Sequence, residues 1–317
     1  MLILVAGITG NVGQEMALAA FNAGHSVRGL SRNPSKLPES ISSKLESFVT
    51  SKSSIDIPAL DVACSGVDAI VCAYKPEPEP SLDGQLMLLR AAERSGVKRF
   101  HAASWNLDWS GLPLGEHETY DAYISFLHHA RVSSPIKPLY TFCGVLAKTF
   151  FAVPKAGKLE DNSSFWQRIE DGKRRINVLG TGDEMYDFTP EEDAAAFTIA
   201  LITSEKAENG GVYYYCSDSF TLKQWKETYE RITGREVEWN VTGLTGEMAD
   251  GLVQKMRSEA LANDQVREKL SEYIGLVYVK YLLNGGMGQK RSDRDMFPQV
   301  AAHRKTLEEY IKKNPEF

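Results

Sequence analysis

The chain has little of what builds disulfide-bonded, membrane-spanning or secreted proteins. Its 317 residues include four cysteines, which form no Cys-x-x-Cys pair and have no metal-ligand spacing: Cys64, Cys72, Cys143 and Cys216. Each lies in or beside an apolar run, so we expect buried thiols in a reducing compartment. No stretch reaches the ~18 apolar residues of a membrane span, and no basic segment precedes the apolar start of the chain, as a secretion signal requires. These absences predict a cytoplasmic protein.

A marked charge of one sign is also absent. The sequence has 36 Lys+Arg and 42 Asp+Glu, so its net charge is 36 − 42 = −6 at pH 7. A mildly acidic chain has no electrostatic footprint for nucleic acid or for a membrane surface. No His and Glu stand at the i,i+4 spacing that would indicate a metal site. We therefore expect a small-molecule ligand, and neither nucleic acid, membrane nor metal.

Short apolar runs alternate with amphipathic stretches through the first half of the chain. The runs are Leu2–Ala6, Ser26–Leu30, Phe48–Val49, Ala69–Ala73, Arg99–Ala103 and Leu139–Val145. This alternation predicts an α/β fold, with a Rossmann-type doubly wound parallel sheet covered by helices on both faces. After Phe150 the alternation loosens, which indicates a second lobe.

Three local patterns outside these runs also predict structure. Alternate prolines in Tyr74–Pro80 predict a stiff extended loop. This loop follows the fourth strand, where it could line a ligand crevice or form a plain surface turn. Thr221–Gln224 has the pattern of a helix cap. The chain from Thr245 to about Leu283 is mostly helical in pattern.

The strongest motif is the GxxGxxG turn Gly7-Ile8-Thr9-Gly10-Asn11-Val12-Gly13. It follows an apolar strand at once and opens an amphipathic helix, which is the context that a dinucleotide-binding turn requires. The first glycine permits the tight turn, and the second lets backbone amides approach a pyrophosphate. The third brings helix and strand close together, and the pyrophosphate then lies at the positive end of the helix.

The second strand indicates which dinucleotide binds. An NAD site would place Asp or Glu ~20 residues after the glycines, but Val27–Lys36 contains no acid. Arg32, with Ser31 and Lys36, can instead hold a 2′-phosphate through charge-assisted hydrogen bonds. The sequence therefore predicts NADP(H) as the cofactor.

These residues together resemble the NmrA-like, isoflavone-reductase-like branch of the atypical short-chain dehydrogenase/reductase (SDR) family. The glycine turn has the spacing of that branch. Four later segments resemble its motifs in the same order along the chain: Val97–Phe100, Pro138–Thr141, Phe188–Ala195 and Thr221–Arg235. The resemblance covers about residues 1–240.

The resemblance implies an NAD(P)-binding Rossmann core at 1–153, completed by elements within 187–216. It also implies a smaller, mostly helical substrate lobe at 154–186 and 217–317, with a cleft between the two. By position, Ala73, Tyr74 and Ala103 would flank the nicotinamide half of the cofactor. A bulky substrate pocket would be lined by aromatic residues, namely Trp105, Phe142, Phe150, Phe151 and Trp166. Each of these is also an ordinary core candidate.

The usual proton donor of the SDR family is a Tyr with a Lys four residues later, and this chain lacks the pair. Tyr120 and Tyr123 lie in the right segment, but their fourth neighbours are Ile124 and Leu127. The lysine that the isoflavone-reductase branch uses is also missing. The candidates for catalysis are therefore Tyr120 or Tyr123, with Ser104 orienting the substrate. Lys148 or a histidine (His101, His128 or His129) could be a substitute acid.

Three functions remain open from the sequence. The first is an NADP(H)-dependent reductase of a bulky, aromatic or conjugated small molecule. The second is a non-redox isomerase or cyclase of secondary metabolism that retains the nucleotide. The third is a nucleotide-sensing regulator of the NmrA type, which would bind a protein partner.

Overall fold

The structure, a computed structural model, describes residues 1–151, 166–168, 173–286, 288–289 and 291–315. For 166–168 only the backbone is described. The chain divides into two compact units. The first unit comprises Met1–Phe142, Glu191–Tyr215 and Ser292–His303, and the second comprises Cys143–Pro190, Cys216–Arg291 and Arg304–Phe317.

The first unit is built on a seven-stranded sheet in the order β11-β6-β5-β4-β1-β2-β3, in which every neighbouring pair is parallel. The strands are β1 (Leu2–Ala6), β2 (Ser26–Ser31), β3 (Ser47–Thr50), β4 (Ala69–Cys72), β5 (Arg99–His101), β6 (Leu139–Phe142) and β11 (Gly211–Tyr214). The continuous apolar runs become central strands because both faces of the sheet are covered. The predicted Rossmann-type fold is confirmed.

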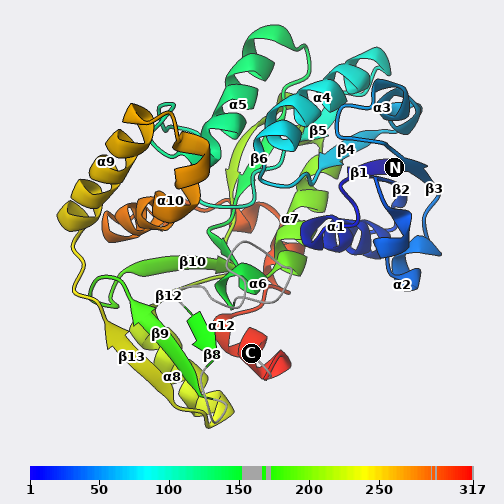
Figure 1. The fold of residues 1–317 in the computed structure, drawn as a ribbon. Coiled ribbons are helices and arrows are strands. Elements are labelled where there is room, and N and C mark those ends of the chain that lie inside the picture. The colour runs from blue at the N-terminus through cyan, green and yellow to red at the C-terminus, as the bar shows by residue number, and fades with distance from the viewer. Residues whose placement is uncertain (152–165, 169–172, 287, 290, 316–317) are drawn as a thin grey trace. The chain divides into compact units, whose positions relative to one another are not determined.

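Helices cover both faces of this sheet (Figure 1). On one face α1 packs against α7, and on the other α3 packs against α4 and α4 against α5. These helices are α1 (Asn11–Asn22), α3 (Ile57–Cys64), α4 (Gln85–Arg94), α5 (Asp121–Ser133) and α7 (Glu191–Thr203), and the short helices of this unit are α2 (Glu39–Ser42) and α11 (Pro298–Ala301). The carboxyl ends of the parallel strands therefore meet at one edge, where such folds bind ligands.

The second unit combines two small sheets with helices. One sheet has the order β12-β10-β7 and the other β13-β9-β8. Their strands are β7 (Val145–Leu146), β8 (Trp166–Arg168), β9 (Arg174–Val178), β10 (Met185–Thr189), β12 (Asp218–Thr221) and β13 (Val237–Val241). The helices are α6 (Ala147–Phe150), α8 (Leu222–Thr233), α9 (Gly246–Ala262), α10 (Val266–Leu283) and α12 (Leu307–Lys313).

Local predictions from the sequence are largely confirmed. Thr221 and Gln224 form a capping box at the start of α8, and the helical pattern after Thr245 becomes α9 and α10. The proline-rich stretch differs from expectation, because a π-helix begins at Glu79 and runs to Gly84. Pro80 lies in its first turn, where a missing N–H costs no hydrogen bond. No helix in the described part of the chain is long and apolar enough to cross a membrane.

Candidate functional site

The glycine turn joins β1 to α1 through close backbone contacts. Gly7 has a φ of +82°, and a Cβ on it would lie 2.4 Å from the carbonyl oxygen of Ala73. Its N–H donates to the Leu30 carbonyl oxygen at 2.8 Å, and the Gly10 N–H donates back to the Gly7 carbonyl oxygen at 3.0 Å. Only glycine satisfies both the left-handed φ and the approach to Ala73.

The other two glycines of the turn differ in what surrounds them. A Cβ on Gly13 would lie 2.3 Å from the Gly7 carbonyl oxygen, so α1 can approach β1 only because Gly13 has no side chain. A Cβ on Gly10 would meet nothing closer than 3.4 Å. Gly10 is exposed at the N-cap position of α1. Its lack of a side chain leaves open the space next to the first amides of the helix.

The N-terminus of α1 is suited to an anion. Its first turn contains no acidic residue, and no side chain in the described part of the chain caps it. Thr9, Asn11 and Val12 are half-buried around it, and the Gln14 side-chain amide donates to the Thr9 carbonyl oxygen at 3.1 Å. The leading N–H groups of a 12-residue helix and its dipole favour a negatively charged group at this position.

Basic side chains follow the end of β2, next to the glycine turn. Ser31 is buried, and its hydroxyl accepts from the Asn33 N–H at 3.3 Å. Arg32 and Lys36 are exposed, and neither forms an ion pair with any residue that the structure describes. Arg28, in contrast, is paired with Glu46 at 3.3 Å. Two cations are therefore available at the carboxyl end of β2.

The loops after β4 and β5 lie at the same edge of the sheet. Ala73 follows β4, and its N–H donates to the Ala6 carbonyl oxygen at 2.8 Å. Tyr74 is half-buried beside Gly7, and burial raises the pKa of its hydroxyl well above the ordinary value. Ala103 follows β5, and its N–H donates to Oε1 of Gln85 at 2.9 Å. Sequence analysis did not identify Gln85, because a lone glutamine after a proline-rich stretch matches no motif.

Ser104, predicted to orient a substrate, is buried and hydrogen-bonded to backbone. Its hydroxyl donates to the Ala102 carbonyl oxygen at 3.1 Å and accepts from the Thr141 N–H at 2.8 Å. Only 2% of its surface is exposed. In this arrangement the Ser104 hydroxyl links the ends of β5 and β6.

Tyr120 and Tyr123 lie in a buried aromatic cluster of the first unit. Tyr123 stacks on Trp109 with ring centroids 5.4 Å apart, and Phe142 meets Trp109 edge-on at 5.1 Å. Tyr120 stacks on Trp109 at 6.4 Å. Only 2% of Tyr120 and 4% of Tyr123 is exposed. These rings bury a large apolar area and stabilise the β5–α5 connection.

Trp105 and His101 also form part of the interior of the first unit. Their rings stack with centroids 4.9 Å apart, and Trp105 donates its indole N–H to the Thr198 hydroxyl at 2.9 Å. Burial lowers the pKa of His101 to about 3. His101 is therefore neutral at pH 7 and cannot donate the proton of an imidazolium there. The other two candidate histidines, His128 and His129, are exposed on α5.

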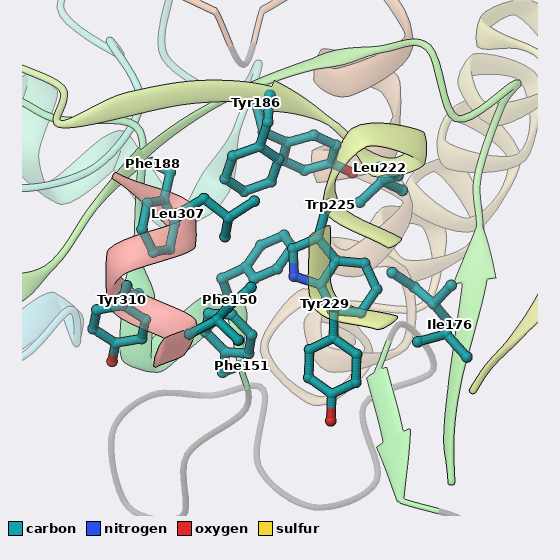
Figure 2. Close-up of a cluster of buried hydrophobic side chains, with 14 of the residues drawn as sticks. Phe150, Phe151, Ile176, Tyr186, Phe188, Leu222, Trp225, Tyr229, Leu307 and Tyr310 are labelled. Carbon is teal, nitrogen blue, oxygen red and sulfur yellow. The ribbon is translucent and has the colours of Figure 1, made fainter. Parts of the chain in front are cut away.

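The remaining predicted residues belong to the second unit. Lys148 is half-buried in α6. Phe150 and Phe151 belong to a buried cluster with Phe188 and Trp225, as Figure 2 shows. Trp166 is in β8, but its side chain lies outside the described residues. The described residues contain no group of His, Cys, Asp or Glu that could hold a metal ion.

Comparison with known proteins identifies the family. The profile of the NmrA-like family matches residues 1–311. The chain belongs to the NmrA-like family. The resemblance drawn from its motifs is therefore confirmed, and the match extends beyond the residues that carried it.

Known proteins similar to this NmrA-like chain include reductases. Pinoresinol reductase 2 from Arabidopsis thaliana is 24% identical over 324 residues, covering 98% of this chain and 96% of that protein. A solved structure, AtPrR2 with NADP+ and (+)pinoresinol, has a TM-score of 0.72 at 20% identity and covers 98% of this chain and 97% of its own. An NADPH-dependent quinone oxidoreductase from Escherichia coli, complexed with NADPH, has a TM-score of 0.71 at 18% identity and covers 99% of both chains. The structural likenesses show a shared fold.

The two glycines at the start of α1 should respond differently to a methyl group. Gly13→Ala places a Cβ against backbone at 2.3 Å and should lower the free energy of unfolding by about 1–3 kcal/mol or more. Gly10→Ala meets only ordinary contacts, and the less favourable N-cap residue should lower it by only about 0.5–1 kcal/mol. Urea denaturation of both variants measures the difference. Equal stabilities would contradict the described geometry.

Ser104→Ala should lower the free energy of unfolding. It leaves the buried Thr141 N–H without its acceptor, so we expect a loss of ~1–3 kcal/mol in the free energy of unfolding. Ser110→Ala, at a half-buried loop serine whose hydroxyl donates to Asp108 in an exposed hydrogen bond, is the control and should be nearly neutral. An unchanged stability together with a lost reaction would instead support the catalytic role predicted for Ser104.

Proposed function

We propose that this chain is an NADP(H)-dependent reductase of a bulky, aromatic or conjugated small molecule. The observation that carries the proposal is that two features suited to phosphate groups lie at the same edge of the sheet, where the parallel strands end. An acid-free helix N-terminus follows the glycine turn, and the exposed Arg32 and Lys36 follow β2. The first matches a pyrophosphate and the second a 2′-phosphate. Family membership and the reductases among the similar proteins support the same function.

The residues of the first unit fit this cofactor. The amides of Gly10–Gly13 and Thr9, with the close turn at Gly7, would bind the pyrophosphate. Ser31, Arg32 and Lys36 would bind the 2′-phosphate. The loops at Ala73, Tyr74 and Ala103 would lie beside the nicotinamide half. When bound, NADPH would supply a hydride to the substrate.

The catalytic candidates in this proposal are those that the sequence predicts. The roles in catalysis stay predictions for Tyr120, Tyr123, Ser104 and Lys148. The two tyrosines and the serine are buried in the described structure. This burial favours a substrate that accepts hydride with little acid assistance, such as a quinone or a conjugated carbonyl. It also motivates the second candidate function, a non-redox isomerase or cyclase that retains the nucleotide.

Single-turnover oxidation of bound NADPH tests the reductase. The protein saturated with NADPH is mixed with quinones, enones or imines, and the loss of nicotinamide absorbance is followed. We expect hydride transfer to at least one conjugated acceptor. Tight NADPH binding without transfer to any of them would count against the reductase. A reaction that proceeds equally well with NADP+ and NADPH would establish the non-redox function.

Arg32→Ala tests the cofactor preference. Loss of a charge-assisted hydrogen bond should weaken NADPH binding by roughly 10- to 100-fold. NADH has no 2′-phosphate, so its affinity should stay the same. Lys98→Ala is a matched control, because Lys98 is exposed just before β5, at the opposite edge of the sheet. The assignment of the 2′-phosphate site is wrong if Arg32→Ala and Lys98→Ala bind NADPH equally well.

A further inference from the structure

Gln85 is a fully buried amide between the two loops at the proposed nicotinamide side. It is the first residue of α4 and follows the π-helix Glu79–Gly84. None of its surface is exposed. Burying an amide is costly unless each polar atom has a partner, so its contacts show why a glutamine is tolerated here. A π-helix in this position is itself a feature that often accompanies functional sites.

Both ends of the Gln85 amide bind backbone. Oε1 accepts from the Ala103 N–H at 2.9 Å, and Nε2 donates to the Ser81 carbonyl oxygen at 2.6 Å. The Ser81 hydroxyl in turn donates to the Lys75 carbonyl oxygen at 2.8 Å. A chain of three buried or part-buried hydrogen bonds therefore runs from the loop after β5 to the loop after β4. We name Gln85 and Ser81 the amide relay.

The amide relay acts where the chain leaves the sheet. The Ala102 N–H still donates to Leu139 of β6 at 2.9 Å. One residue later, the Ala103 N–H turns away from the sheet and donates to Gln85. Without this acceptor the Ala103 N–H would need another partner, and the loop would have to move to find one.

The other end of the relay reaches the loop that contains Tyr74. Lys75 is the next residue, and its carbonyl accepts from Ser81. Gly84 brings the π-helix against the same loop, since a Cβ on it would lie 3.3 Å from the Tyr74 ring and 2.8 Å from Cβ of Ser54. The relay therefore sets the distance between the backbone at Tyr74 and the backbone at Ala103.

We propose that Gln85 is a positioning residue for the nicotinamide half of the cofactor. The inference rests on the proposed NADP(H) site, in which Tyr74 and Ala103 lie beside that half. Gln85 touches neither cofactor nor substrate in this role. It holds the two loops at the spacing that the nicotinamide ring requires, and it has no part in binding the adenosine 2′-phosphate half.

The affinities for two nucleotides, one with and one without the nicotinamide half, test this role. Gln85→Leu keeps the volume of the side chain and removes both hydrogen bonds. NADPH affinity should fall roughly tenfold, because a buried donor and a buried acceptor lose their partners and the loops shift. The affinity for adenosine 2′,5′-bisphosphate, which has no nicotinamide, should stay within about twofold. The fluorescence of bound NADPH should change as well.

A control variant tests whether lost stability alone explains the result. Leu88→Ala opens a cavity at a fully buried position of the same helix and leaves the relay intact. It should lower the melting temperature without separating the two affinities. Ser81→Ala, which removes only the bond to Lys75, should give a smaller shift in the same direction as Gln85→Leu. It also serves as the test if Gln85→Leu does not fold.

Three outcomes would overturn the inference. Gln85→Leu or Ser81→Ala could bind both nucleotides as the wild type does. Either variant could weaken both nucleotides equally, which would indicate a general structural role. A wild-type protein that binds neither nucleotide would overturn the proposed NADP(H) site itself, and the inference with it. If the wild type binds both nucleotides but the variants do not lose NADPH affinity selectively, the proposed function stands. Only the role of Gln85 is then rejected.

Discussion

The close backbone approach at the glycine turn is the constraint on which the candidate site depends. Gly7 lies against the carbonyl of Ala73 and donates to Leu30, so a single residue ties the end of β1 to the ends of β4 and β2. Gly13 then lets α1 come down onto the turn. Because these contacts are between backbone atoms, no side-chain rearrangement can relieve a substitution. The position of the α1 amides follows directly from them.

Buried polar side chains hold the backbone in place where the chain leaves the other strands. Gln85 and Ser104 each satisfy backbone groups where the chain leaves β5, and His101 reaches the Thr141 hydroxyl at 2.9 Å. Buried groups of this kind stabilise only when every partner is present. The same chemistry that makes Ser and His plausible catalysts also makes them useful structural partners. A serine at a plausible catalytic position can therefore also satisfy backbone groups, as Ser104 does.

Aromatic residues show the limit of sequence reasoning most plainly. Phe150 and Phe151 come after the sixth strand, where the sequence allows either a substrate pocket or ordinary core, and in the structure they pack with Trp225 inside the second unit. In the first unit, Trp109 stacks on both Tyr120 and Tyr123. A large apolar ring gives the same sequence signal whether it covers a ligand or fills a core. Only the contacts distinguish the two.

The sequence by itself determined the parallel α/β architecture, the glycine turn, the absence of acids after β2 and the family. These follow from local patterns, because strand periodicity, helix caps and left-handed glycines depend on near neighbours in the chain. The tertiary structure alone decided that Gln85 spans two loops and that Ser104 binds Thr141. Those partners are 18 and 37 residues apart in sequence, so only folding brings the donor to its acceptor.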